Sequence, residues 1–192
     1  MSKSDPASVK KDRKKTIRWI IFVFVATICI SALISLGSEE LMAVSSTLVA
    51  FFILLAIIML GIVFDIIGVA VTSADEKPFH SMAARKVPGA QESIQLLRNA
   101  GKVGSICNDV IGDICGVVSG SASATIAARM LDNFTFTWPR IIGLIMSALV
   151  AGLTVGGKAI GKSFAINSCT NIVHTVGRII WWLRGFTRIF KK

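Results

Sequence analysis

The sequence predicts an all-α integral membrane protein with four transmembrane helices, a short cytoplasmic helical segment and a C-terminal juxtamembrane amphipathic helix. Hydrophobic residues make up 53% of the 192 residues and charged residues only 17%, a more apolar balance than soluble domains of this length usually have. Apolar runs long enough to cross about 30 Å of hydrocarbon recur along the chain. Basic and nearly uncharged connections alternate between these runs, which is typical of multi-pass membrane proteins.

The boundaries of the predicted segments follow from the charges, glycines and prolines that interrupt the apolar runs. The first run carries one charge, Arg18, and is too long for a signal peptide, so we expect it to remain as an anchor. A tight turn is expected at 37–40, and the next run holds a single charge, Asp65. The predicted segments are a basic, unstructured tail (1–16), transmembrane helices (17–36, 44–72, 104–130 and 141–160), a cytoplasmic connecting segment with a short helix (73–103), and a basic amphipathic juxtamembrane helix (167–192).

The distribution of Lys and Arg predicts the orientation of the chain. Seven basic residues lie in the tail and at the start of the first run, none in the first turn and five in the 73–103 segment. Two flank the connection near 132–139, and seven lie between Lys158 and the C-terminal end. Because basic loops tend to stay in the cytoplasm, this alternation favours four spans with both termini in the cytoplasm.

The third predicted span is the most polar, and two stripes of residues run along it. One stripe repeats every four positions and would let another helix approach closely. The other contains Ser105, Asp109 and Asp113, and because carboxylates facing lipid are costly, we expect it to face protein, water or a cation. The first stripe comprises Gly104, Asn108, Gly112, Gly116, Gly120, Ala124 and Ala128.

Two interpretations of these polar residues remain open. In the first they bind a hard cation such as Mg²⁺, which accepts oxygen ligands and retains several waters. In the second the helix packs against a neighbour, and its two Asp residues are neutralised by protonation or by pairing with Lys or Arg. We expect the remaining candidate, Asp65, to lie toward the cytoplasmic end of the second span, within reach of water. The candidate metal ligands are Ser105, Asn108, Asp109, Asp113 and Asp65.

Other motifs indicate no separate chemistry. Gly156–Ser163 satisfies the phosphate-binding pattern GxxxxGK[ST], but it follows an apolar helix instead of a strand, so we expect no nucleotide partner and place Lys158 and Lys162 at the cytoplasmic boundary. Basic residues gather at segment ends, which argues against nucleic acid. The four cysteines form no CxxC pair, and His80 and His174 have no partner at ligand spacing. No nucleophile accompanies a base, so we expect neither an enzyme nor a cofactor.

The C-terminal amphipathic segment is expected to lie at the membrane surface. Apolar residues recur at helical spacing opposite Arg178, Arg184 and Arg188, and Trp181 and Trp182 suit the headgroup level. Because Arg side chains suit anionic lipid, the lipid bilayer is the expected partner, and a helix that binds another protein is the alternative.

Three segments together resemble the transmembrane domain of the CorB/CorC (cyclin M) magnesium transporter family. Phe64–Ser73 resembles a helix ending of the form FSxSETALTS, and Ile111–Gly112–Asp113 falls where that family has I-G-N. Val155–Ala165 resembles the family's FGEIIPKxLA ending. The order and spacing of these segments agree with the family over roughly residues 50–185.

The resemblance implies a three-helix core, a belt helix after the last span, a homodimer and a bacterial inner membrane. It also implies transport of a divalent cation, Mg²⁺ or Co²⁺, and we expect the family's cytoplasmic CBS domains to be lacking. The chain departs from the family pattern where Gly68 and Lys158 stand in place of acidic residues, Asp113 in place of Asn and Gly161 in place of Pro. Lys158 would repel a divalent cation at that position. A non-transporting membrane scaffold or accessory subunit derived from the same fold is therefore the alternative function.

Overall fold

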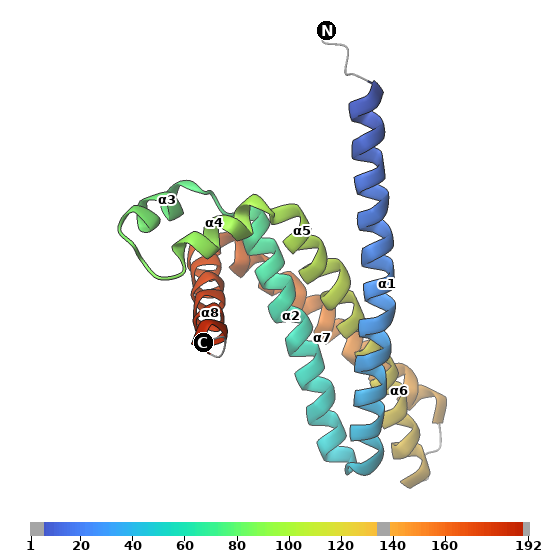
Figure 1. Ribbon diagram of the computed structural model, residues 1–192. Helices are drawn as coiled ribbons and strands as arrows, with labels where there is room; N and C mark the ends of the chain where they lie inside the picture. The colour runs from blue at the N-terminus through green and yellow to red at the C-terminus, as the bar shows by residue number, and fades with distance from the viewer. Residues whose placement is uncertain (1–5, 134–138, 190–192) are drawn as a thin grey trace.

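The computed structural model describes residues 6–133 and 139–189, and the elements within these ranges are all helical, as predicted. Helices α1, α2, α6 and α7 form an elongated bundle, and α3, α4 and α8 lie beside one end of it (Figure 1). In chain order the elements are α1 (Pro6–Val44), α2 (Thr47–Ser73), α3 (Lys77–Ala84), α4 (Ala90–Arg98), α5 (Ala100–Gly104), a π-helical segment η1 (Ser105–Gly112), α6 (Asp113–Asn133), α7 (Pro139–Asn167) and α8 (Cys169–Ile189).

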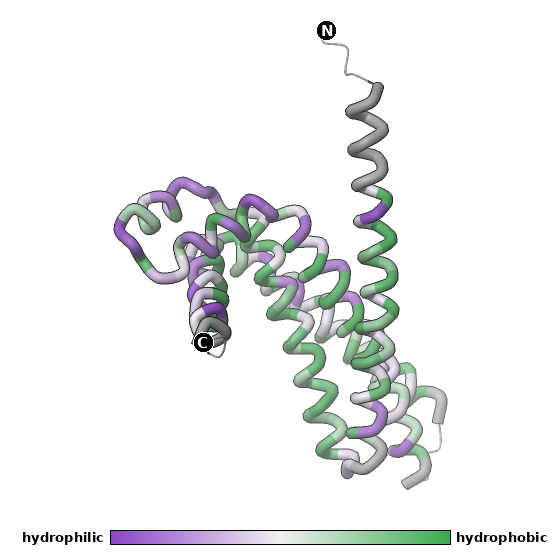
Figure 2. Tube along the Cα trace, in the orientation of Figure 1, coloured by the Kyte–Doolittle hydropathy of each residue, from purple (hydrophilic) through white to green (hydrophobic). Residues whose placement is uncertain are grey.

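Four helical stretches are long and apolar enough to cross a membrane, which matches the number predicted from the sequence. Large apolar side chains cover their outer surfaces: Phe24, Leu144 and Ile160 are 66%, 72% and 76% exposed. Figure 2 shows the apolar character as green along α1 and α2. Apolar surface on this scale is unusual for a protein in water and suits contact with lipid. The four stretches are Thr16–Met42, Thr47–Ser73, Ala100–Leu131 and Ile141–Asn167.

The first helix differs from the prediction at both of its ends. The basic tail is helical from Pro6, and residues 1–5 lie outside the described ranges. The turn expected at 37–40 is helical as well, and within it Ser38 Oγ donates to Ser35 O at 2.9 Å. The chain reverses later, at Ser46, whose side chain accepts a hydrogen bond from Val49 N (3.5 Å) and caps α2.

Helix α2 lies at the centre of the bundle and contacts α1, α5, η1, α6, α7 and α8. Its buried residues Ala50, Leu54 and Ile58 pack in one apolar cluster with Ile126 of α6 and Val150 of α7. The chain passes from α6 to α7 through 134–138, which lie outside the described ranges. Helix α7 begins and ends beyond the predicted 141–160, so the fourth span is longer than the hydropathy of its centre suggested.

The segment between the second and third spans forms a compact cap. The helix predicted near 90–97 is confirmed as α4, and α3 is an additional helix that the sequence pattern did not indicate. Phe79 of α3 and Val173 of α8 are fully buried in a second apolar cluster, together with Val71 of α2 and Leu97 of α4. The predicted amphipathic segment is α8, and residues 190–192 lie outside the described ranges.

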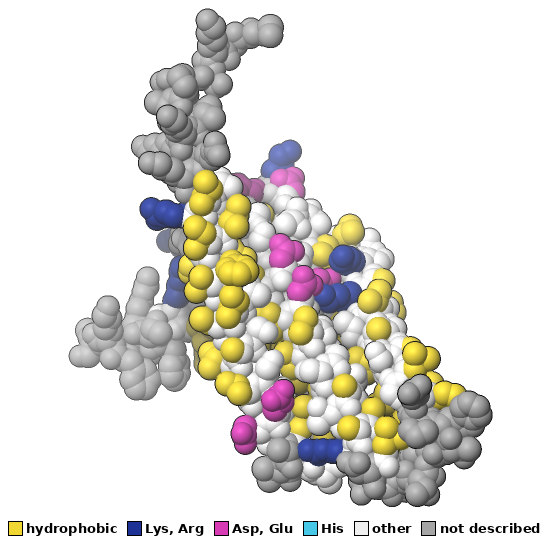
Figure 3. Space-filling view, turned by 90° about the vertical axis from the view of Figure 1, so that its right-hand side faces the viewer, with side chains coloured by type: hydrophobic (Ala, Val, Ile, Leu, Met, Phe, Trp, Pro, Cys, Tyr) yellow, Lys and Arg dark blue, Asp and Glu magenta, His cyan; other side chains and the backbone are white. Residues whose placement is uncertain are grey.

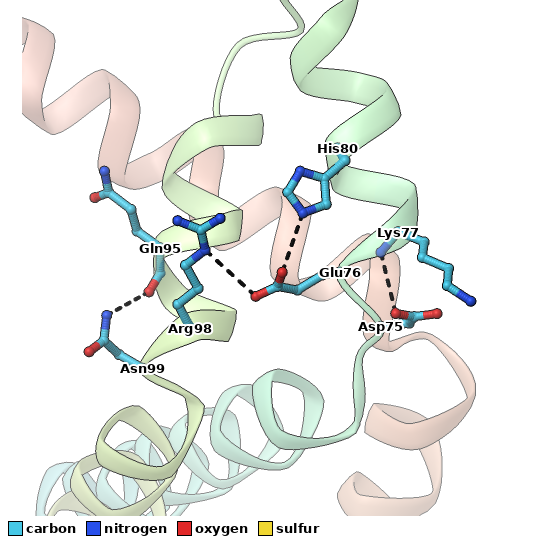
Figure 4. A network of polar contacts seen from close by, with 7 residues as sticks. All are labelled: Asp75, Glu76, Lys77, His80, Gln95, Arg98 and Asn99. Carbon is cyan, nitrogen blue, oxygen red and sulfur yellow. Dashed lines mark hydrogen bonds and ion pairs between the residues drawn. The ribbon is translucent and has the colours of Figure 1, made fainter.

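A polar network on the outside of this cap joins the start of α3 to the end of α4 (Figure 4). Glu76 lies 3.3 Å from His80 Nε2 and 3.9 Å from Arg98 Nε, and Asp75 accepts a hydrogen bond from Lys77 N at 3.3 Å. Because these side chains are largely exposed, water and salt screen their attraction, and the network contributes little stability. The buried apolar cluster beneath it holds the cap together.

Helix α8 is fastened to the cap where two backbones come close together. The fully buried Ser93 hydroxyl of α4 lies 2.9 Å from Gly89 O and 3.2 Å from Val173 O, so it can donate to either carbonyl. A Cβ atom at Gly177 would overlap both Ser93 Oγ and Gly89 O. The absence of a side chain at Gly177 therefore permits the contact between α4 and α8.

We expect Gly177→Ala to lower the free energy of unfolding by about 1–3 kcal/mol, because the added methyl group forces the two helices apart. The measurement is the midpoint of unfolding in mild detergent. Gly185→Ala is the matched control, since a Cβ atom on this second glycine of α8 would meet nothing within 4 Å. Equal midpoints for the two variants would show that α8 is not held by this contact.

Candidate ion-binding site

The third span, Ala100–Leu131, contains eight residues of π-helix, Ser105–Gly112, between α5 and α6. In a π-helix the hydrogen bonds join residues five apart; such segments are rare and occur frequently at functional sites. Gly112 follows Cys107 by five residues, and a Cβ atom at Gly112 would lie only 3.3 Å from Cys107 O. Glycine therefore fits the crowded end of the widened turn. The sequence pattern did not indicate this irregularity.

Asp65 of α2 faces the end of the π-helical segment. Its side chain is only 4% exposed, and Oδ2 is buried with no hydrogen-bond partner among the described residues. The expectation that Asp65 reaches water is therefore wrong for this chain. Asp65 Oδ1 would lie 3.7 Å from a Cβ atom at Gly112, so the carboxylate lies against backbone that carries no side chain. An ionised carboxylate is costly here unless a cation or a proton compensates it.

Lys158 of α7 approaches the same point from the other side. Its Nζ donates to Gly112 O at 3.3 Å and lies 3.6 Å from Asp113 Oδ1. The Lys158 side chain is only 20% exposed, so it turns inward against the third span. Asp65, Asp113 and Lys158 thus meet around Gly112, at the junction of three helices. We refer to these three side chains as the Gly112 junction.

The members of the junction differ in exposure. The Asp113 side chain is 73% exposed, whereas Asp65 is buried. Near the middle of the face drawn in Figure 3, acidic and basic side chains adjoin one another, with hydrophobic side chains on either side.

A second unpartnered oxygen lies one turn away along the same helix contact. Asn108 Oδ1 is buried without a hydrogen-bond partner among the described residues. The Asn108 side chain fills the space that a side chain at position 68 would need, because a Cβ atom at Gly68 would overlap it. Gly68 follows Asp65 by three residues on α2, and Asn108 precedes Gly112 by four residues on the third span. The unpartnered oxygens of Asp65 and Asn108 therefore lie on successive turns of the contact between these two helices.

The other predicted ligands are placed less favourably for direct binding. Ser105 is half-buried, and Asp109 is exposed. Asp113 is exposed as well, so within a single chain only Asp65 of the three acidic candidates is buried. Among the side chains that the structure describes, no three His, Cys, Asp or Glu come close enough to hold a metal ion together. A cation here would need carbonyl, amide and water oxygens in addition to carboxylate, which is a ligand set that Mg²⁺ accepts.

The small-residue stripe packs against α2 at its start and lines an open groove further along. A Cβ atom at Gly104 would come within 2.8 Å of Thr72, whereas Gly116 and Gly120 have nothing within 4 Å. Four residues of α-helix turn about 40° more than a full turn, so a four-residue repeat winds slowly around the helix. The later part of the stripe therefore leaves α2 and lines an open groove between α6 and α7. The groove is lined by Gly120, Ser123, Ala124, Ala127, Ala128, Leu131, Gly143 and Ser147.

The segment that matches the phosphate-binding pattern has another role. Gly156–Ser163 lies inside α7 and is helical, so it does not form the loop that cradles phosphate. A Cβ atom at Gly157 would overlap Ile62, which shows that this glycine serves the close packing of α7 against α2. Close packing was the role that the sequence indicated for these glycines.

No family model, curated protein or solved structure matches this chain. The resemblance to the CorB/CorC family consequently rests on the three sequence segments described above. The structure establishes the coarser class: an all-helical chain with four helices able to span a membrane and a buried carboxylate at their contact.

We expect Gly68→Ala to destabilise the protein by about 1–3 kcal/mol, because the new methyl group displaces the buried Asn108 amide. The double variant Gly68→Ala/Asn108→Ala should recover part of this loss, since it removes the atoms that clash. Unfolding midpoints in detergent measure both effects, with Gly116→Ala in α6 as the control, since a Cβ atom there would meet nothing within 4 Å. A double variant no more stable than expected from the two single changes would contradict this arrangement.

Proposed function

We propose that this protein transports a divalent cation, Mg²⁺ or Co²⁺, across a membrane through a CorB/CorC-like helical bundle. The observation that supports the proposal is the buried Asp65 carboxylate with its unpartnered Oδ2, next to a π-helical segment in a candidate span. Ionisable groups at such depth are costly and therefore favour a functional role. The proposed chemistry is cation binding without catalysis, so neither an enzyme activity nor a bound cofactor forms part of it.

Charge balance suggests how a cation would enter. Asp65 and Asp113 carry two negative charges when ionised, and Lys158 compensates one of them across 3.6 Å to Asp113. A divalent cation that replaced the ammonium group would compensate both carboxylates. We therefore propose that the cation binds between Asp65 and Asp113 after Lys158 swings away, and that Asn108 and Ser105 border the path.

Flux of Mg²⁺ or Co²⁺ into proteoliposomes tests this proposal. Asp65→Asn should reduce the initial rate about tenfold or more, because it removes the buried charge that attracts the cation. Lys158→Met should lower the cation concentration needed for half-maximal rate by about tenfold, because the competing positive charge is gone. Lys162→Met, one turn further along α7 and exposed, is the matched control and should behave as the parent.

Three outcomes of the flux measurement are informative. Equal flux through the parent, Asp65→Asn and empty liposomes would overturn transport. Normal flux in the parent with unchanged cation dependence in Lys158→Met would retain transport but exclude competition by Lys158. A loss of flux in Lys158→Met equal to that in Asp65→Asn would show that the ion pair is needed to hold the bundle together.

The proposed setting is a bacterial inner membrane with both termini, α3, α4 and α8 on the cytoplasmic side. The uneven distribution of Lys and Arg supports this orientation. A homodimer is proposed as well, because the groove between α6 and α7 exposes small residues and Asp109 and Asp113 are uncovered in the single chain.

A cysteine introduced near either end of the chain should react with an impermeant thiol reagent only after the cells are opened. The expected mass of the detergent-solubilised protein, after subtraction of detergent, is that of two chains. Labelling of one end in intact cells would contradict the four-span orientation, and a single-chain mass would contradict the dimer.

The alternative function is a non-transporting membrane scaffold or accessory subunit derived from the same fold. The Lys158–Asp113 ion pair favours it, because a permanent pair of this kind would neutralise Asp113 and leave it unavailable to a cation. The parent and all variants would then give no flux, and gentle extraction would recover a second protein bound through α8.

A further inference from the structure

A cavity of about 730 Å³ lies between the loop that precedes α4 and the outer half of α8. It is separate from the Gly112 junction, since no residue of that junction lines it. The loop and α8 are held together next to the cavity, because Gly89 of the loop packs directly against the backbone at Gly177 and Arg178. The lining consists of Val87, Pro88, His174, Thr175, Arg178, Ile179, Trp181 and Trp182.

The walls of the cavity are mainly apolar, and the charged residue in its lining is Arg178. Ile179, Trp181 and Trp182 are 53%, 49% and 60% exposed, so this half of α8 presents apolar surface that the cap does not cover. Tryptophan favours the boundary between hydrocarbon and headgroups. A ligand that fits must therefore combine an extended apolar part with a compact anionic part.

Arg178 is available for the anionic part. Its side chain is exposed at the cavity, and its guanidinium can hold a phosphate through two parallel hydrogen bonds. His174 lines the cavity beside it, but its Nε2 is buried and is not offered to a ligand there.

The surrounding charge agrees with an anionic occupant. Lys86 borders a smaller hollow of about 200 Å³ that shares Val87, Pro88 and Trp181 with the cavity. Glu92 borders this hollow too, but Arg184 lies 3.8 Å from its Oε1 and offsets its charge. The rim of the cavity is therefore net positive.

We propose that this cavity binds one anionic phospholipid, with the phosphate at Arg178 and an acyl chain along Ile179 and the two tryptophans. The inference rests on the proposed membrane location and is independent of cation transport. A bound lipid would fix α8 relative to the cap, in the manner of headgroup sites formed by basic pockets at the membrane surface.

Native mass spectrometry of the detergent-solubilised protein, titrated with phosphatidylglycerol or with phosphatidylcholine of the same acyl chains, tests the proposal. We expect one phosphatidylglycerol to bind the parent at least about tenfold more tightly than phosphatidylcholine. Arg178→Gln should abolish this preference, and Arg178→Lys should retain part of it. Lys77→Gln, an exposed lysine at the start of α3 that does not line the cavity, is the control.

Equal binding of the two lipids by the parent, or an unchanged preference in Arg178→Gln, would overturn the proposal. Displacement of the lipid by millimolar inorganic phosphate would show that the cavity recognises a free anion instead of a phospholipid, and would overturn it as well. If the protein kept this lipid preference but carried no cation, the proposed transport would be refuted and the lipid site would stand.

Discussion

The contact around Gly112 is the constraint on which the arrangement of the bundle depends. Three helices converge there, and each brings a charge: Asp65 from α2, Asp113 from the start of α6 and Lys158 from α7. Lys158 joins α7 to the third span through Asp113 and the Gly112 carbonyl, and Asp65 of α2 lies against the same glycine. The π-helical segment ends at this residue.

The arrangement separates a buried charge from an exposed one. Asp65 lies under the helix contact and lacks a partner for one oxygen, whereas Asp113 is open to the outside and already paired. The two proposed functions differ in what happens to this ion pair. In the transporter the pair opens; in the scaffold it stays closed.

The cap, which contains α3 and α4 and has α8 packed against it, has a different physical basis. It is held by buried apolar side chains around Phe79 and by the close backbone contact of Gly89 with α8, while its ion pairs lie in the open. The outer half of α8 is left with tryptophans and arginine beside a cavity. The helix bundle therefore has charged side chains at the contact of its apolar helices. The cap and α8 are instead held together by apolar side chains beneath exposed charges.

The sequence by itself determined the all-helical class, the four apolar stretches, the helix at α4 and the amphipathic character of α8, because hydropathy and charge spacing are local properties. It also identified Asp65, Asn108 and Asp113 as unusual residues for a span. Only the tertiary structure showed that Asp65 is buried, that Lys158 turns inward and that Asp109 stays exposed. These outcomes depend on which helices meet and at what rotation. The π-helical segment changes the direction in which successive side chains of the third span point. The four-residue repeat of small residues in the sequence does not indicate this change.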